Sequence, residues 1–432
     1  MNGAERVPTQ QEVVEVDVAL LKPSETAWLS ETEGRETRGN EALHSAGCCT
    51  CSGNGDDDDD EILLAIANGK RLLCLTFRRK EVSEAEGGAF EIRGRCEHKT
   101  QANISAVAWI RLNFEGEDVW LLLYGKEDGC VGILDARGKV VFVSQIHSSN
   151  VLRIHSHSLT TEVAAAETES QGATVVCSDA VVLLPAEELL HVYQNWKARR
   201  RNRRAADFAK YDLSSRMATV SDAVTVGYAS FSLHEQLMFT SRGGARERKV
   251  RTLVGGVDPA LICIHAEEKD SSRSSSPPDS GLLSAGKFLG NWAPPVPFVQ
   301  KLKKNIMMGG KEEVFSRFVD PKRLIVSLSL AAGHPLVACS DSVGRVLVVD
   351  ARNFMVTRVL KGYRDAKIAW LDNYLIIMAP KRKRVEIWDV FKNCAIKHFD
   401  CTSADCISHS KRSAIMTKPR REGLAVSLIK LA

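Results

Sequence analysis

The segment PLVACSDSVGRVLVVDARNFMVTRVL, residues 335–360, carries the pattern that determines the fold of this chain. It contains a short apolar strand, a polar turn at Val343-Gly344, and a second apolar strand that ends at Asp350. Glycine in the turn tolerates the positive φ that a tight hairpin needs, and an aspartate after the strand can accept N–H bonds from the next turn. The continuous apolar run of the second strand is typical of an inner strand covered on both faces.

The same pattern recurs elsewhere, as VWLLLYGKEDGCVGILDARGKVVFV (119–143) and YLIIMAPKRKRVEIWDVFKNCAIKHF (374–399). The shared aspartates are Asp135, Asp350 and Asp389, and the last two are about 40 residues apart, the period of a four-stranded propeller blade. Weaker units are visible at 62–77, 151–184, 223–265 and 414–429, which brings the count to about seven, within the range of known propellers. We therefore predict an all-β, seven-bladed, WD40-like β-propeller.

We expect residues 1–432 to form one propeller, with blades from about 62 to 430 and a closing strand near 12–21. Apolar and other residues alternate from Val14 to Leu20, as in a half-buried strand. Three insertions are expected. They are an acidic loop at 22–61 that contains Asp56–Asp60, a basic helical insertion at 186–222, and a long, partly disordered linker at 266–322 that is rich in Ser and Pro and ends in an amphipathic segment.

Composition excludes several classes of protein. Of the 432 residues, 44% are hydrophobic and 26% charged, which is ordinary for a globular chain and unlike a disordered one. The formal net charge of +4 is too small at this length to indicate nucleic-acid binding by itself. We expect no signal peptide and no transmembrane helix. The 12 cysteines are scattered, so reduced thiols in a cytoplasmic protein are expected.

No pattern of catalytic residues is recognisable, because the chain lacks phosphate-binding, nucleophile-elbow and zinc-protease motifs. The group His147, His155 and His157 lacks a fourth zinc ligand. His44 with Cys48, Cys49 and Cys51 resembles half of a zinc site only. We therefore predict no metal, no cofactor and no enzyme activity. The alternative of an enzyme site in the propeller channel would require turnover by the isolated chain.

Basic residues form clusters at 197–204, 246–251, 301–304, 381–384 and 418–421. The first lies within a sequence, 186–210, that predicts one helix: Pro185 precedes it, acidic residues begin it, and apolar residues recur at three- and four-residue spacing. Such clusters fit solvated faces, an acidic partner or an anionic membrane; nucleic acid is the weakest option because aromatic residues are not interleaved with them. The candidate partner-binding residues of this helix are Arg199, Arg200, Arg201, Arg203 and Arg204.

The stretch Asp320–Trp388 carries the most specific signal. It contains a strand pair from Ser327 to Ala338, the block KGYRDA at 361–366 followed by Trp370, and a strand that ends at Trp388. In these features it resembles the N-terminal region of the non-catalytic, regulatory subunit of the Rab GTPase-activating protein complex. The likeness covers most of residues 60–430. The chain departs from the family at Leu360, where members carry Trp, and members continue into a long helical region, whereas this chain stops at Ala432.

The resemblance implies a regulatory, scaffolding subunit that forms a heterodimer with a catalytic subunit and helps to engage a Rab GTPase at membranes. It further implies roles in Rab nucleotide exchange, vesicle trafficking and autophagy, in the cytoplasm and peripherally on endomembranes. Because the arginine finger of such a complex belongs to the other subunit, no catalytic residue is expected here. The alternative is a generic propeller scaffold whose basic helix contacts nucleic acid or directs nuclear import.

Two interpretations of the KGYRDA block remain open from the residues alone. The block lies between two predicted strands, so Gly362 can reverse the chain while Arg364 and Asp365 hold adjacent blades together. Alternatively, Tyr363 and Arg364 are residue types that anchor protein interfaces. The candidate partner-binding residues of this region are Gly362, Tyr363, Arg364, Asp365 and Trp370.

Overall fold

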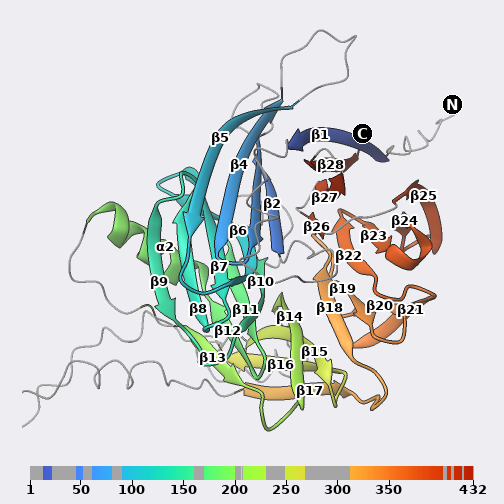
Figure 1. Cartoon of the computed structure of the whole chain (residues 1–432). Coiled ribbons are helices and arrows are strands. Elements are labelled where there is room, and N and C mark those ends of the chain that lie inside the picture. Colours follow the sequence, from blue (N-terminus) through green and yellow to red (C-terminus); the bar gives the residue numbers. More distant parts are fainter. Residues whose placement is uncertain are drawn as a thin grey trace, which may run out of the picture.

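The computed structural model describes twelve parts of the chain: residues 13–21, 45–51, 61–79, 90–159, 170–199, 206, 208–229, 249–267, 312–401, 406–409, 413–420 and 423–431. For residues 13–21, 45–51, 406–409, 413–420 and 423–431, and for the strand ends 79, 90–91, 267 and 312–315, the description covers the backbone alone. Within these parts, the strands form seven four-stranded antiparallel sheets arranged around a centre (Figure 1).

Six of the sheets are blades whose four strands follow one another along the chain. Blade one contains β2 (Ser45–Cys51), β3 (Glu61–Asn68), β4 (Arg71–Arg79) and β5 (Phe90–Lys99). Blade two contains β6 (Ile104–Phe114), β7 (Glu117–Lys126), β8 (Cys130–Asp135) and β9 (Val140–Gln145). Blade three contains β10 (Val151–His157), β11 (Gly172–Cys177), β12 (Ala180–Leu184) and β13 (Ala209–Asp212).

Blades four to six complete this series. Blade four contains β14 (Thr219–Tyr228), β15 (Lys249–Val257), β16 (Leu261–Glu267) and β17 (Glu312–Phe318). Blade five contains β18 (Ile325–Leu330), β19 (Leu336–Asp341), β20 (Arg345–Asp350) and β21 (Met355–Lys361). Blade six contains β22 (Lys367–Leu371), β23 (Tyr374–Ala379), β24 (Arg384–Asp389) and β25 (Cys394–Asp400), with the short 3-10 helix η5 (Pro380–Arg382) between β23 and β24.

The remaining sheet, here called the closing sheet, joins the two ends of the described chain. It contains β26 (Cys406–His409), β27 (Ser413–Arg420) and β28 (Gly423–Leu431), and its outer strand is β1 (Val13–Leu21), which pairs antiparallel with β28. This is the closure that the alternating pattern near residues 12–21 predicts. The innermost strands contact one another in the order β2, β6, β10, β14, β18, β22, β26 and back to β2, so the ring is closed.

The predicted all-β propeller architecture is thus confirmed, and so is the local chemistry of its hairpins. Gly69, Gly129 and Gly344 have positive φ in the turns that connect the second and third strands of their blades. The backbone N–H of Arg137 donates to the Asp135 carboxylate at 3.0 Å, and Asp350 and Asp389 accept corresponding bonds in their own turns. The strand-terminal aspartates therefore hold the turns that follow them.

The boundaries of the three predicted insertions need correction. The helix α2 (Ala186–Lys197) ends well before residue 210, because Arg199 adopts a left-handed φ of 50° and the chain from Ala209 pairs with β12 as β13. The insertion at 22–61 contains β2, and the linker at 266–322 contains β17 at its C-terminal end. The acidic run Asp56–Asp60 and the Ser- and Pro-rich part of the linker lie outside the described residues.

Helix α2 packs on the outside of the ring, against β6, β9 and β11 (Figure 1). Leu189 and Val192 are buried on its inner face, and the Tyr193 ring meets Phe114 edge-on with 5.5 Å between ring centroids. Apolar residues of blades two and three belong to the same core cluster as α2. The predicted apolar stripe of the helix is therefore confirmed over its first three turns.

Successive blades fit together at two equivalent serine and glycine positions. Ser105 on β6 donates its hydroxyl to the carbonyl oxygens of Gly125 and of Val151, the first residue of the next blade's innermost strand. Ser221 on β14 bridges Gly255 and Ile325 in the same way. A Cβ atom at Gly125 would lie 2.8 Å from Cβ of Val151. Glycine is needed here because the neighbouring inner strand occupies the space of a side chain.

We predict that Gly125→Ala lowers the free energy of unfolding by about 1–3 kcal/mol, because the added methyl group overpacks the contact with Val151. In a Gly125→Ala/Val151→Ala double variant, the space freed by the smaller side chain should recover part of this loss. The measurement is urea denaturation of the wild type, both single variants and the double variant. Strictly additive effects would contradict the proposed steric origin.

Candidate partner-binding surface

Three connections at one end of the strands meet at the boundary between blades five and six. They are the β19–β20 turn (residues 342–344), the β21–β22 loop (362–366) and the β23–β24 turn (380–383). The backbone N–H groups of Gly362 and Tyr363 both donate to the carbonyl oxygen of Gly344, at 3.0 and 2.8 Å. The Arg382 guanidinium donates to the carbonyl oxygen of Lys361 at 3.3 Å. The three connections therefore form one continuous surface.

Tyr363 connects this surface to the interior of blade six. Its side chain is buried, and its hydroxyl donates a 2.5 Å hydrogen bond to Oε2 of Glu386 on β24. Trp388 Nε1 donates to the same oxygen at 3.1 Å. The Arg382 guanidinium lies over the Tyr363 ring, 4.4 Å from its centroid, and pairs with Oε1 of Glu386 at 3.2 Å. One buried carboxylate thus fixes the loop on the third strand of blade six.

The charges in this cluster shift the pKa values of both partners. Burial raises the pKa of Tyr363 to about 12, with a further contribution from the Glu386 carboxylate. Burial alone would raise the pKa of Glu386, but hydrogen bonds from Tyr363 and Trp388 and the nearby guanidinium groups outweigh it, so the pKa lies below its ordinary value. Glu386 is therefore ionised and Tyr363 is neutral at physiological pH.

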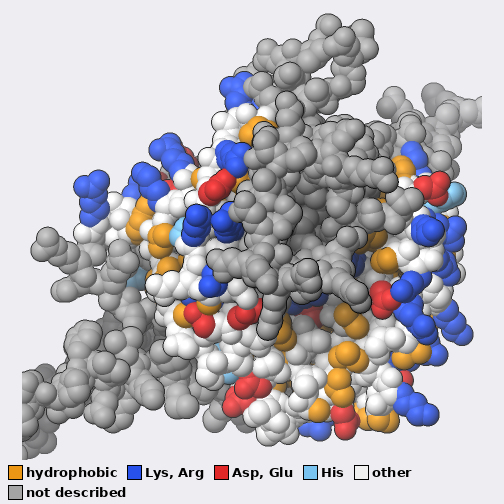
Figure 2. Space-filling view, viewed as in Figure 1, with side chains coloured by type: hydrophobic (Ala, Val, Ile, Leu, Met, Phe, Trp, Pro, Cys, Tyr) orange, Lys and Arg blue, Asp and Glu red, His pale blue; other side chains and the backbone are white. Residues whose placement is uncertain are grey.

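Basic side chains surround the cluster on its exposed side. Lys361, Arg364, Lys381, Arg382 and Lys383 are exposed, and Arg345 and Arg384 are half-buried at the margin. Asp365 is exposed and pairs with Lys381 at 3.7 Å. Lys and Arg side chains gather on the side of the molecule where β20, β21, β24 and β25 lie (Figure 2). We call this group of seven basic residues the basic turn surface.

The predicted site residues separate into two groups. Gly362, Arg364 and Asp365 lie on the basic turn surface and are exposed. Tyr363 and Trp370 are in the core, and Trp370 donates its indole N–H to the carbonyl oxygen of Ser329 in blade five at 2.9 Å. The prediction that these two rings offer a docking surface therefore needs correction: their role here is to join blades. Of the arginines after α2, Arg199 is exposed, and Arg200, Arg201, Arg203 and Arg204 lie outside the described residues.

Sequence reasoning did not identify Glu386 or Arg382 as partners of Tyr363. One signal was available in the sequence: a charged residue lies between Val385 and Ile387, which are both buried in the third strand of blade six. Buried charges need partners. The partners themselves come from a turn and from the neighbouring blade, which no local pattern reveals.

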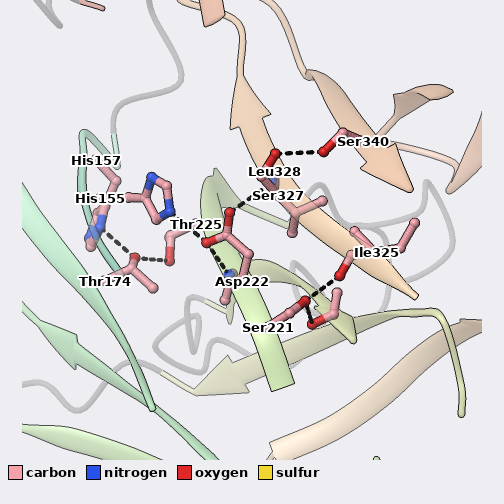
Figure 3. Close-up of polar contacts among 12 residues, drawn as sticks. His155, His157, Thr174, Ser221, Asp222, Thr225, Ile325, Ser327, Leu328 and Ser340 are labelled. Atoms are coloured by element: carbon pink, nitrogen blue, oxygen red, sulfur yellow. Dashed lines mark hydrogen bonds and ion pairs between the residues drawn. The ribbon is translucent and has the colours of Figure 1, made fainter. Parts of the chain in front are cut away.

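The three histidines considered as metal ligands bind other groups instead, and two of them, His155 and His157, are drawn in Figure 3. His155 donates from Nε2 to Oδ1 of Asp222 at 2.6 Å, and His157 hydrogen-bonds Thr174 at 3.0 Å. His147 accepts a hydrogen bond from the backbone of Ser149 at 3.0 Å. Burial lowers the pKa of His157 to about 4, so this ring is neutral. Among the residues that the structure describes, no group of three or more His, Cys, Asp or Glu is arranged to hold a metal ion.

Asp222 links three successive blades through its buried carboxylate (Figure 3). Oδ1 accepts from His155 on β10 and from the backbone N–H of Ala223 at 2.9 Å. Oδ2 accepts from the backbone N–H of Leu328 on β18 at 2.7 Å. All these donors are satisfied by one side chain, which makes it a central connection between the inner strands of blades three, four and five.

Comparison with known proteins identifies the family of this propeller. Residues 58–407 match the family described as the Rab3 GTPase-activating protein regulatory subunit N-terminus. The chain belongs to this family. The predicted resemblance is thereby confirmed, and the match includes β3 and extends into β26.

Individual proteins match this chain either over a short stretch or at low sequence identity. A Rab3 GTPase-activating protein regulatory subunit of Caenorhabditis elegans is 33% identical over 92 residues, which are 19% of this chain and 7% of that protein. The chain thus spans a small part of the length of this relative. Two crystal structures of Sqt1 from Chaetomium thermophilum, one bound to the N-terminus of the ribosomal protein L10, are 10% identical with a TM-score of 0.48. Each match covers 90% of this chain. It covers 97% of the Sqt1 chain in the complex with the L10 segment and 96% of the Sqt1 chain in the other structure.

No helix in the described parts of the chain has the length and apolar character needed to cross a membrane.

We predict that Tyr363→Phe lowers the free energy of unfolding by about 2 kcal/mol at neutral pH, because a hydrogen bond to a buried carboxylate is lost. The pKa of Glu386 is depressed in the folded state, so this stabilisation is present above the unfolded pKa of about 4.3 and is lost as the pH falls through the folded value. The difference in Tm between wild type and Tyr363→Phe should therefore shrink below pH 4, and a difference independent of pH would contradict this origin.

We also predict that Asp222→Asn lowers the free energy of unfolding by about 2–4 kcal/mol. An amide offers one acceptor oxygen and turns its NH₂ group toward either His155 or the Leu328 N–H, leaving a buried donor without an acceptor. Urea denaturation measures the loss, and Asp118→Asn, at an exposed position, serves as the control with an expected change below about 0.5 kcal/mol. Equal effects of the two substitutions would disprove the bridging role.

Proposed function

We propose that this chain is a non-catalytic, scaffolding part of a Rab GTPase-activating complex and that it binds the catalytic subunit as a heterodimer. The observation that carries the proposal is the family match, which extends over residues 58–407 and so over most of the propeller. A closed ring of sheets suits this role, because its turns are held on a rigid framework and can present a fixed surface to a partner. The chemistry of GTP hydrolysis would then belong to the Rab and the catalytic subunit.

We assign the contact with the catalytic subunit to the basic turn surface. Five of its seven cations are exposed, while the turns that carry them are tied to Gly344 and Glu386, so little conformational entropy would be lost on binding. A positive surface attracts an acidic segment of a partner and accelerates their encounter. The same positive charge would favour an anionic membrane, at about 1 kcal/mol for each Lys or Arg near the lipid.

The wider role follows from the family resemblance. The complex would act in the cytoplasm and peripherally on endomembranes, engaging a Rab GTPase and supporting nucleotide exchange during vesicle trafficking and autophagy. The basic turn surface supports the membrane part of this proposal through its charge. The exchange activity has its support in the resemblance.

We predict that Arg364→Glu/Lys383→Glu weakens binding to the catalytic subunit at least about tenfold, since two charge reversals at a contact cost more than 1.4 kcal/mol. The matched control is Arg137→Glu/Lys139→Glu, which makes the same charge change in an exposed turn at the other end of the strands. Binding is measured by co-purification and titration with residues 1–432 at several salt concentrations.

The possible outcomes test the proposed function and the assigned binding surface separately. Failure of the wild-type chain to form a complex at micromolar concentration would overturn the proposed function. Equal weakening by the two double variants would overturn the assignment of the basic turn surface while leaving the function in place. Loss with the first variant alone, and weaker wild-type binding at high salt, would support both.

A further inference from the structure

Two cysteines face each other in blade one. Cys74 on β4 and Cys96 on β5 are directly paired in the antiparallel register of these strands. Directly opposite residues in such a pair have Cα atoms about 4.5–5.5 Å apart, and their side chains lie on the same face. A disulfide needs Cα atoms about 4.4–6.8 Å apart, so the strands already have a suitable spacing. The two thiols also lie close enough for each to change the pKa of the other.

The two sulfur atoms differ in their access to solvent. Cys74 is buried in a core cluster with Leu72 and Trp109. Cys96 is half-buried on the outer strand of its blade, and its neighbours Arg95 and Glu97 are exposed. Gly138 of blade two lies close against it, since a Cβ atom at Gly138 would be 2.6 Å from the sulfur of Cys96. A small oxidant can therefore reach Cys96 from the outer edge, while Cys74 is shielded by the core.

The interaction between the two thiols distinguishes them further. The interaction with Cys74 lowers the pKa of Cys96, against the opposing effects of burial and of the Asp135 carboxylate. The interaction with Cys96, together with burial, raises the pKa of Cys74. The accessible sulfur is thus the one that becomes a thiolate more readily, and thiolates are the reactive form of cysteine.

We propose that Cys74 and Cys96 form a redox-active dithiol that a peroxide converts to a disulfide. The Cys96 thiolate attacks one oxygen of hydrogen peroxide, the O–O bond breaks, and the sulfenic acid of Cys96 and water form after uptake of a proton. The Cys74 sulfur then attacks the sulfenic sulfur, the S–S bond forms, the S–O bond breaks, and a second water leaves with the Cys74 proton. Both cysteines together lose two electrons, which reduce the peroxide, and a thiol reductant reverses the change.

Other described cysteines lack this arrangement. In the strand registers, Cys130 is opposite Gln145, Cys263 is opposite Leu253 and Ser316, and Cys394 is opposite Asp389. Burial raises the pKa of Cys263 to about 11 and of Cys177 to about 12, which keeps these thiols protonated. Cys394 is exposed and serves as an internal reference for simple surface oxidation.

The test treats the reduced full chain with a small excess of hydrogen peroxide and digests it under non-reducing conditions. Mass spectrometry should find the Cys74 and Cys96 peptides joined, with the loss of two hydrogen atoms, at least about tenfold more abundantly than any disulfide of Cys394, because only the paired thiol has a resolving partner. Dithiothreitol should restore both thiols. Sulfenylation of Cys394 with Cys96 still a free thiol would overturn the proposal.

Single substitutions distinguish Cys96, which attacks the peroxide, from Cys74, which resolves the sulfenic acid. In Cys74→Ala, a dimedone label should accumulate on Cys96, because the resolving sulfur is missing. In Cys96→Ser, Cys74 should remain reduced, and Cys394→Ser should leave the disulfide yield unchanged. Absence of a dimedone label in a folded Cys74→Ala variant, with circular dichroism like that of the wild type, would disprove the order of the steps. The wild-type cross-link decides the proposal even where a variant fails to fold.

Discussion

The contact between neighbouring innermost strands is the constraint on which the rest of this structure depends. A four-stranded sheet in isolation exposes two edges and two apolar faces. Here each innermost strand lies against the next, around the ring from β2 to β26 and back. Apolar side chains of one blade share their core clusters with those of the next, as in blades two and three. Each blade is thus stabilised mainly by its neighbours.

Polar groups specify how closely the inner strands approach. The hydroxyls of Ser105 and Ser221 and the carboxylate of Asp222 satisfy backbone groups of the following blade. The register shifts by one residue at the start of β6, β10, β14 and β18, which is where these contacts are made. A β-bulge bends the strand locally and redirects its side chains. The bulges in β6 and β14 therefore place equivalent serine contacts between blades two and three and between blades four and five.

Much of the fold could be predicted from residues that act locally. Turn glycines, strand-terminal aspartates and continuous apolar runs identified the central hairpins of blades two, five and six, because these features depend on the hairpin itself. Strand β2 was missed because SAGCCTC has neither alternation nor an apolar run. Strands β13 and β17 follow long connections and are held by pairing with β12 and β16, so their position depends on the ring rather than on their own composition. The burial of Tyr363 could not be predicted for a similar reason, because its hydroxyl is bound by Glu386 on another strand.

The direction of the strands determines where the chain can vary in length. In every blade, the strand ends joined by the first-to-second and third-to-fourth connections lie at one end of the ring, and in sequence the longest of these connections join β10 to β11, β12 to β13, β14 to β15 and β16 to β17. Doubling the length of a flexible connection costs only about 0.6 kcal/mol. An insertion of one residue in 362–366 would instead displace a loop bound to Gly344 and Glu386. Divergence among related propellers should therefore appear as length changes at one end and as amino-acid substitutions at the other.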